Sequence, residues 1–233
     1  MTYLNRKESP RTPLILAGVA FALSLVLERV PLLGWLVYAF RLFDTLIHEL
    51  SHGLMALLTG GRFLHFVITP DSSGMATTAG GWRLLVIPAG YLGAALFGGL
   101  LLLLTNRSSS RTRRWTSLGL GLFFILVTVF FARNWTAIAV GLLWALALLA
   151  LSQYGPPLLQ ALGLNLLAIQ CSLNALDSLG GLVLLNTGPW RRPNDAQSMA
   201  ALTPLPAAVW AILWSLIALA IFIQCAYLSL RKP

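Results

Sequence analysis

The sequence predicts an all-α polytopic membrane protein with about seven transmembrane helices and one short membrane-associated β-hairpin. Of its 233 residues, 58% are hydrophobic and only 10% are charged, whereas a soluble domain carries about 25% charged residues. The mean hydropathy is +0.79. Repeated apolar runs near the length of roughly 20 residues that crosses a bilayer take up most of the chain. We therefore expect a single integral-membrane domain over residues 1–233, with no room for a separate soluble domain.

The apolar runs place the expected elements in order. The first two spans, residues 14–27 and 32–58, are separated near Pro31, and Gly60 lies just past the second, as at a helix C-terminus. Residues 62–82 are too polar and too rich in Gly and Thr to span, and their turn residues after Ile68 predict a hairpin. The remaining spans are expected at 84–104, 115–131, 135–151, 158–185 and 204–228, with a basic loop at 106–114 after the third.

The formal charge of +9 is compatible with nucleic-acid binding in principle. The basic residues, however, stand in short segments between apolar runs, where they anchor and orient membrane helices. We expect the lipid bilayer as a partner and no nucleic acid. Cys171 and Cys225 both fall in apolar spans, which favours small buried side chains over a disulfide.

The second span carries a zinc-binding pattern. His48, Glu49 and His52 fit the H-E-x-x-H motif, and residues four apart share one face of a helix, so both imidazoles can bind one Zn²⁺. Glu49 then lies beside the open coordination position, where it can take a proton from the attacking water. The alternative interpretation is a structural polar seam between helices, but such a seam has no reason to adopt the zinc spacing.

A catalytic zinc site needs a third protein ligand. No glutamate follows Glu49, and Met55 and Leu58 occupy the positions where the metzincin pattern needs Gly and His. Asp177 is the preferred ligand, because the span 158–185 runs parallel to the zinc helix and places this carboxylate at a similar depth. Asp195, just beyond the same end, is the alternative. The downstream residues that remain as candidates are His65, Asp71, Asp177 and Asp195.

Two further residues have candidate roles near this site. Asp44, one turn before His48, can accept a hydrogen bond from a ligand histidine, or it can pair with Arg41 on its own helix. Asn174, one turn before Asp177, can bind a substrate backbone or an oxyanion, or form a hydrogen bond between helices. The sequence leaves both pairs of alternatives open.

These features together resemble the site-2 protease family of intramembrane zinc metalloproteases. The family's late Leu-Asp-Gly motif supplies its third zinc ligand, and the string from Leu176 through Asp177 matches it except that Ser178 replaces Gly. The family's upstream Asn-Pro element is missing. The stretch 194–196, with a Trp-bearing last span after it, resembles the compact M50B-like peptidases, which lack a PDZ domain. The resemblance implies an active site near the cytosolic face.

The resemblance implies a zinc metalloendopeptidase that hydrolyses peptide bonds in or near transmembrane segments of other membrane proteins. A substrate segment can be held as a strand along the edge 64–69. The alternatives are a catalytically inactive protease-like scaffold or chaperone, and a transporter, although the repeats typical of transporters are not seen.

With seven spans, the zinc site and the N-terminus would share one side of the membrane. That side would hold eight Lys/Arg against seven opposite, too even a division to fix the orientation.

Overall fold

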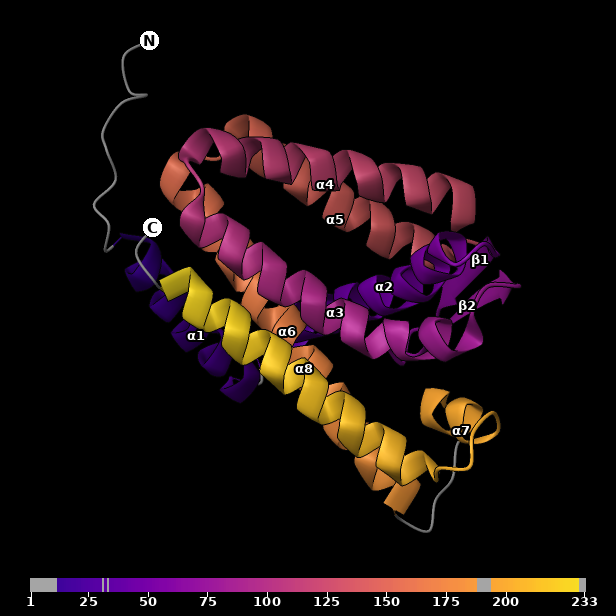
Figure 1. Cartoon of the computed structure of the whole chain (residues 1–233). Coiled ribbons are helices and arrows are strands. Elements are labelled where there is room, and N and C mark those ends of the chain that lie inside the picture. The colour runs from indigo at the N-terminus through magenta and orange to yellow at the C-terminus, as the bar shows by residue number, and fades with distance from the viewer. Residues whose placement is uncertain (1–11, 31, 33, 188–193, 231–233) are drawn as a thin grey trace.

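The computed structural model describes residues 12–30, 32, 34–187 and 194–230. Within these residues it is an α-helical bundle with a two-stranded sheet at one end (Figure 1). Five of the described helices, α3 to α6 and α8, are long and apolar enough to cross a membrane. The membrane-embedded helical architecture agrees with the sequence, while the expected count of about seven spans is not confirmed.

The elements in chain order are α1 (Thr12–Arg29), α2 (Gly34–Leu58), β1 (Arg62–Ile68), β2 (Gly74–Ala79), α3 (Arg83–Arg107), α4 (Ser110–Phe131), α5 (Trp135–Tyr154), α6 (Pro157–Thr187), α7 (Asp195–Ala200) and α8 (Ala207–Leu230).

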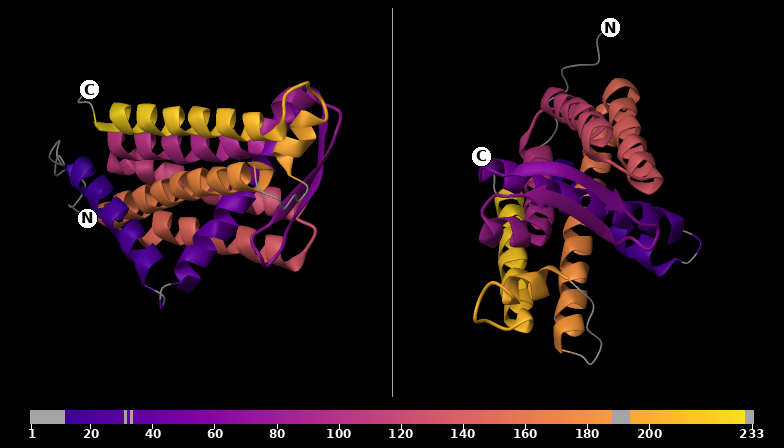
Figure 2. Two further views of the ribbon diagram at one scale, coloured as in Figure 1. Left: turned by 90° about the horizontal axis from the view of Figure 1, so that it is seen from below. Right: turned by 90° about the vertical axis from the view of Figure 1, so that its right-hand side faces the viewer.

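Helices α1 and α2 account for the difference in span count. The apolar part of α1 covers only Ile15–Ser24, and α2 contains three charged residues, Arg41, Asp44 and Glu49. The two helices meet at an angle and together run the length of the bundle once (Figure 1; Figure 2, left). As a result α1 begins at the end where α8 finishes, and the hairpin and α7 lie at the opposite end. We call these the terminal end and the hairpin end.

Two connections differ from the sequence expectation because polar side chains cap helices there. The basic segment expected as a loop at 106–114 is largely helical, since Ser109 caps α4 by accepting a hydrogen bond from the backbone N–H of Thr112 at 3.2 Å. The short helix α7 lies between the spans expected at 158–185 and 204–228, where no element is expected. Asn194 caps it, and its side chain accepts a hydrogen bond from the N–H of Gln197 at 3.0 Å.

Helix α3 lies at the centre of the bundle, and its glycines allow close packing. A Cβ at Gly98 would overlap Ser172 of α6, and one at Gly99 would lie 2.9 Å from Cys225 Sγ of α8. Such small residues let helix backbones approach closely in a membrane. On the other side of α3, the fully buried Phe43 of α2 packs against aromatic rings of α3, α4 and α5. Helix α2 is therefore fixed firmly in the bundle.

The hairpin is anchored to the loop between α4 and α5. Strand β1 pairs antiparallel with β2 from Arg62 opposite Ala79 to Ile68 opposite Gly74. Along its other edge, the Asn134 side chain bonds both the N–H and the C=O of Ile68, at 3.2 and 2.7 Å. The expected substrate-binding edge, 64–69, is thus already occupied on both sides. Within the described residues β2 pairs with no strand other than β1, so its outer edge carries no further strand.

We expect Asn134→Ala to lower the free energy of unfolding by more than a substitution that removes only a helix cap. Asn134 caps α5 through the N–H of Ala137 and also holds Ile68. Ser109→Ala is the matched control, because it removes only a cap at the other end of the bundle. The free energy of unfolding should fall by about 1–2 kcal/mol more in Asn134→Ala than in Ser109→Ala, which is the net value of one or two hydrogen bonds. Thermal unfolding in detergent measures it, and equal losses in the two variants would show that the Asn134 tether contributes nothing.

Candidate metal centre

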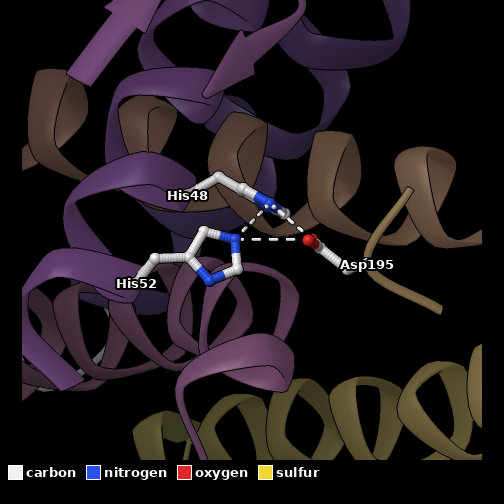
Figure 3. Close-up of side chains that lie close together, drawn as sticks. All are labelled: His48, His52 and Asp195. Carbon is white, nitrogen blue, oxygen red and sulfur yellow. Dashed lines mark hydrogen bonds and ion pairs between the residues drawn. The ribbon is translucent and has the colours of Figure 1, made fainter. Parts of the chain in front are cut away.

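Two histidines of α2 and one aspartate of α7 converge at the hairpin end (Figure 3). The Nε2 atoms of His48 and His52 lie 3.0 Å apart. Oδ2 of Asp195 lies 3.2 Å from His48 Nε2 and 3.4 Å from His52 Nε2. The i, i+4 spacing on α2 brings the two imidazoles together, and the fold adds the carboxylate from a residue 147 positions beyond His48.

Neighbouring groups fix the orientation of both rings. The backbone carbonyl of Val86 on α3 accepts a hydrogen bond from His52 Nδ1 at 2.7 Å. Nε2 of His52 faces the cluster, as in ligand histidines whose other nitrogen donates to a carbonyl. The ring of His48 packs edge-on against Tyr91 with centroids 4.5 Å apart. Nε2 of both histidines and Oδ2 of Asp195 therefore converge on one point.

The donor atoms fit a zinc ion. A circle through three points separated by 3.0, 3.2 and 3.4 Å has a radius of about 1.9 Å. Zinc bonds to nitrogen and oxygen are about 2.0–2.2 Å long, so one ion can reach all three atoms from just outside their plane. Two histidines and one carboxylate are also a ligand set of catalytic zinc sites with an open position.

Asp195 carries the negative charge that this cluster needs. Burial by itself raises the pKa of the Asp195 carboxyl, but hydrogen bonds from His48 and His52 outweigh burial and hold that pKa well below its usual range. Asp195 is thus ionised at neutral pH. A carboxylate partly removed from water beside two imidazoles is a favourable environment for a cation.

Gly90 of α3 leaves the space that a metal ion and its ligands require. A Cβ at this position would overlap Nε2 of both His48 and His52. We therefore expect Gly90→Ala to lose most of its zinc, while Gly119→Ala, whose added Cβ meets nothing within 4 Å, keeps it. Zinc per chain, measured on detergent-purified protein, tests this. Full zinc occupancy in Gly90→Ala would contradict the assignment of the metal position.

Glu49 lies between α2 and the hairpin. It is buried, with 5% of its surface exposed, and the backbone of Ala76 on β2 hydrogen-bonds to its carboxylate. A Cβ at Gly74 would lie only 2.5 Å from Glu49 Oε1, so the glycine lets the strand approach this side chain. Strand β2 therefore positions the carboxylate beside the histidines.

The cluster and Glu49 line one cavity of about 880 Å³. Polar and charged side chains line about half of its wall, although the bundle around it is apolar. The wall formed by the hairpin runs along the outer edge of β2. Lining residues from other elements include Asp44, Thr45, Arg83, Tyr91, Ser178 and Ser198. A cavity of this volume leaves room for water beside these buried groups.

The structure does not bring Asp177 to the histidines. Asp177 is exposed on α6 and lines a second cavity of about 700 Å³ that also includes Ser215 of α8. Its neighbour Ser178 lines the metal cavity instead. Successive helix residues point about 100° apart, so the parallel direction of α2 and α6 does not decide which of the two residues faces the zinc motif.

Two other downstream candidates are engaged within the hairpin. His65 on β1 lies across from Thr77, with Nε2 3.1 Å from the threonine hydroxyl. Asp71 at the turn accepts hydrogen bonds from Thr69 and Ser73, which lower the pKa of its carboxyl to about 2. Neither belongs to the metal cluster among the described residues.

Asp44 and Asn174 occupy different surroundings. Asp44 is buried, lines the metal cavity, and accepts a hydrogen bond from Cys171 Sγ at 3.4 Å. Asn174 is buried on α6, and its Nδ2 finds no hydrogen-bond partner in the described part of the chain. Gly90 and Tyr91 were not predicted as site residues, because a single glycine or tyrosine in an apolar span gives no signal of what it faces.

An apolar helical bundle that encloses a cavity with a His-His-Asp cluster is the arrangement expected of a membrane-embedded metalloprotease. Comparison with known families agrees with this class. The chain belongs to the Peptidase M50B-like family, whose sequence profile matches residues 15–225. A search of curated proteins and a search of solved structures gave no significant match. The chain is thus an integral membrane protein of a metalloprotease family.

Proposed function

We propose that this protein is an intramembrane zinc metalloprotease that hydrolyses peptide bonds in or near transmembrane segments of other membrane proteins. The observation that carries the proposal is the His48, His52 and Asp195 cluster beside Glu49 in one polar cavity. These three residues would hold one Zn²⁺, with Asp195 rather than Asp177 as the third ligand. When bound there, zinc polarises the scissile carbonyl and lowers the pKa of the attacking water.

Glu49 is the proton carrier of the proposed reaction. Its carboxylate takes a proton from the attacking water and later delivers that proton to the leaving amine. Burial between α2 and β2 keeps the side chain in place, and the backbone of Ala76 orients it. Asp44, one turn before His48, adds a buried carboxyl to the wall of the same cavity.

The substrate segment pairs, in this proposal, with β2. Within the described residues β2 pairs with no strand other than β1, and its residues from Gly74 to Thr78 form a wall of the cavity. An extended strand added there would use main-chain hydrogen bonds for binding. The scissile bond would then lie beside Glu49, which contacts the same strand.

Cleavage of a reporter transmembrane helix by the purified protein in detergent or liposomes tests the proposed function. We expect cleavage by the wild type, loss of cleavage after treatment with a zinc chelator, and recovery when zinc is added back. The metal supplies the activated water, so removing it should leave no more than background hydrolysis. Cleavage that persists after complete removal of zinc, measured on the same sample, would contradict a metalloprotease.

A further inference from the structure

One cation in the wall of the metal cavity stands apart from the other charged groups. Three carboxylic acids line the cavity, Asp44, Glu49 and Asp195, whereas Arg83 is the only Lys or Arg among the described residues that line it. Arg83 is exposed and forms no hydrogen bond or ion pair with any described residue. Arg133, at the same end of the bundle, instead donates to two backbone carbonyls at 2.9 and 2.8 Å. The guanidinium donors of Arg83 are therefore available to a ligand in the cavity.

Arg83 lies on the face of α3 that meets the metal cluster. Residues three, four and seven apart share one face of a helix, and Arg83, Val86 and Gly90 have this spacing. The Val86 carbonyl accepts the hydrogen bond from His52, and Gly90 packs against both histidine rings. Because a helix rises 1.5 Å per residue, Arg83 is about 10 Å from Gly90 along the axis. The cation thus belongs to the same wall as the metal cluster but stands two turns away from it.

The junction between β2 and α3 holds the backbone of Arg83 in place. Gly80 and Gly81 have φ angles of 70° and 78°, which glycine adopts without steric cost. The N–H of Trp82 donates to the hydroxyl of Thr59 at the end of α2, at 3.0 Å. Strand β2 leads through this junction into α3 at the hairpin end (Figure 1). Arg83 therefore follows directly on the strand that the proposed function assigns to the substrate.

The position of Arg83 relative to β2 determines which part of a bound segment it meets. Glu49 contacts the backbone of Ala76, and Gly80 lines the same cavity four residues further along. Four extended residues span about 14 Å. In a substrate strand paired with β2, the residue about four positions from the scissile bond would therefore lie beside Arg83.

We infer that Arg83 selects substrates whose bound segment carries an Asp or Glu side chain about four residues from the scissile bond. The inference rests on the proposed function, because it assumes that a peptide segment binds in this cavity along β2. A carboxylate matches the planar guanidinium of arginine, which can donate two parallel hydrogen bonds to it. A basic side chain at the same position would meet a like charge that has no partner among the described residues.

Reporter helices that differ in a single residue test this selectivity. The cleaved bond is first located by mass spectrometry, and Glu, Gln or Lys is then placed four residues from it, on either side in separate reporters. For one side we expect the wild-type kcat/KM to be about threefold to tenfold higher with Glu than with Gln, mainly through KM, as for an exposed ion pair. In Arg83→Gln this ratio should fall to about one, and Arg83→Glu should prefer the Lys reporter.

Arg62→Gln is the matched control for Arg83→Gln. Arg62 is also exposed and pairs with Ala79 at the same end of the hairpin, but it does not line the cavity. The control should keep the wild-type Glu-to-Gln ratio, and zinc content should be unchanged in both variants. If both variants instead lost cleavage of the Glu and Gln reporters equally, the two arginines would be membrane anchors and the inference would fail.

A wild-type Glu-to-Gln ratio near one on both sides of the bond would also overturn the inference, as would a ratio that Arg83→Gln leaves unchanged. Binding of fluorescent reporters to Glu49→Gln, with and without Arg83→Gln, gives the same ratio without cleavage. Reporters that bind with the Glu preference but are never cleaved by the wild type would contradict the protease and support the role of Arg83. Cleavage without any preference would contradict only the role of Arg83.

Discussion

Asp195→Ala is expected to lose its zinc, whereas Asp177→Ala keeps about one zinc per chain. The physical reason is the geometry of the cluster, in which Asp195 Oδ2 lies within 3.4 Å of both histidine nitrogens while Asp177 lines a different cavity. Loss of a direct ligand should weaken zinc binding by more than the 10–100-fold that loss of an outer hydrogen-bond partner costs. Zinc per chain in detergent-purified protein measures it.

The two aspartate variants control for each other, because each removes one carboxylate from the hairpin end of the chain. Size-exclusion profiles in detergent should match that of the wild type, which separates loss of metal from loss of fold. Zinc lost only in Asp177→Ala would return the third ligand to α6 and contradict the arrangement in Figure 3. No zinc in the wild type, under conditions that retain metal, would favour the inactive scaffold.

Glu49→Gln is expected to lower the cleavage rate of the reporter helix by about 10²–10⁴-fold, the usual contribution of a general acid–base group. Glutamine keeps the size of the side chain and can still accept the hydrogen bond from the Ala76 backbone, but it cannot take a proton from water. Zinc content should stay at the wild-type level, because Glu49 is not part of the cluster of ligand atoms. Cleavage rate and zinc content measured on one preparation give both results.

The same variant separates the protease from the scaffold. A scaffold that binds and retains membrane proteins would keep its cellular function in Glu49→Gln, whereas a protease would lose it. Thr45→Ser is a suitable control on the same helix, since its hydroxyl can still donate to Ser72 O, as that of Thr45 does at 2.8 Å. Unchanged cleavage in Glu49→Gln would show that another group moves the proton.

The sequence by itself determined the class of fold and half of the site. Low charge and repeated apolar runs leave few solutions other than membrane helices, because a polar backbone in lipid must satisfy its hydrogen bonds within each segment. The spacing of His48 and His52 already places both imidazoles on one helix face. The turn residues after Ile68 likewise predicted the hairpin, which the structure has at β1 and β2.

Only the tertiary structure decided which carboxylate joins the histidines, which edge of the hairpin carries no further strand, and at which end the site lies. The direction of α6 was compatible with either Asp177 or Asp195 as the third ligand. Asp177 lies on a face of α6 that lines a different cavity, and the short helix α7 brings Asp195 to the cluster. Hydropathy gives the length of an apolar segment, not the angle at which two segments meet. That angle, between α1 and α2, places the terminal end opposite the metal site. Relations within one helix follow from local periodicity, whereas relations between helices depend on packing among residues distant in sequence.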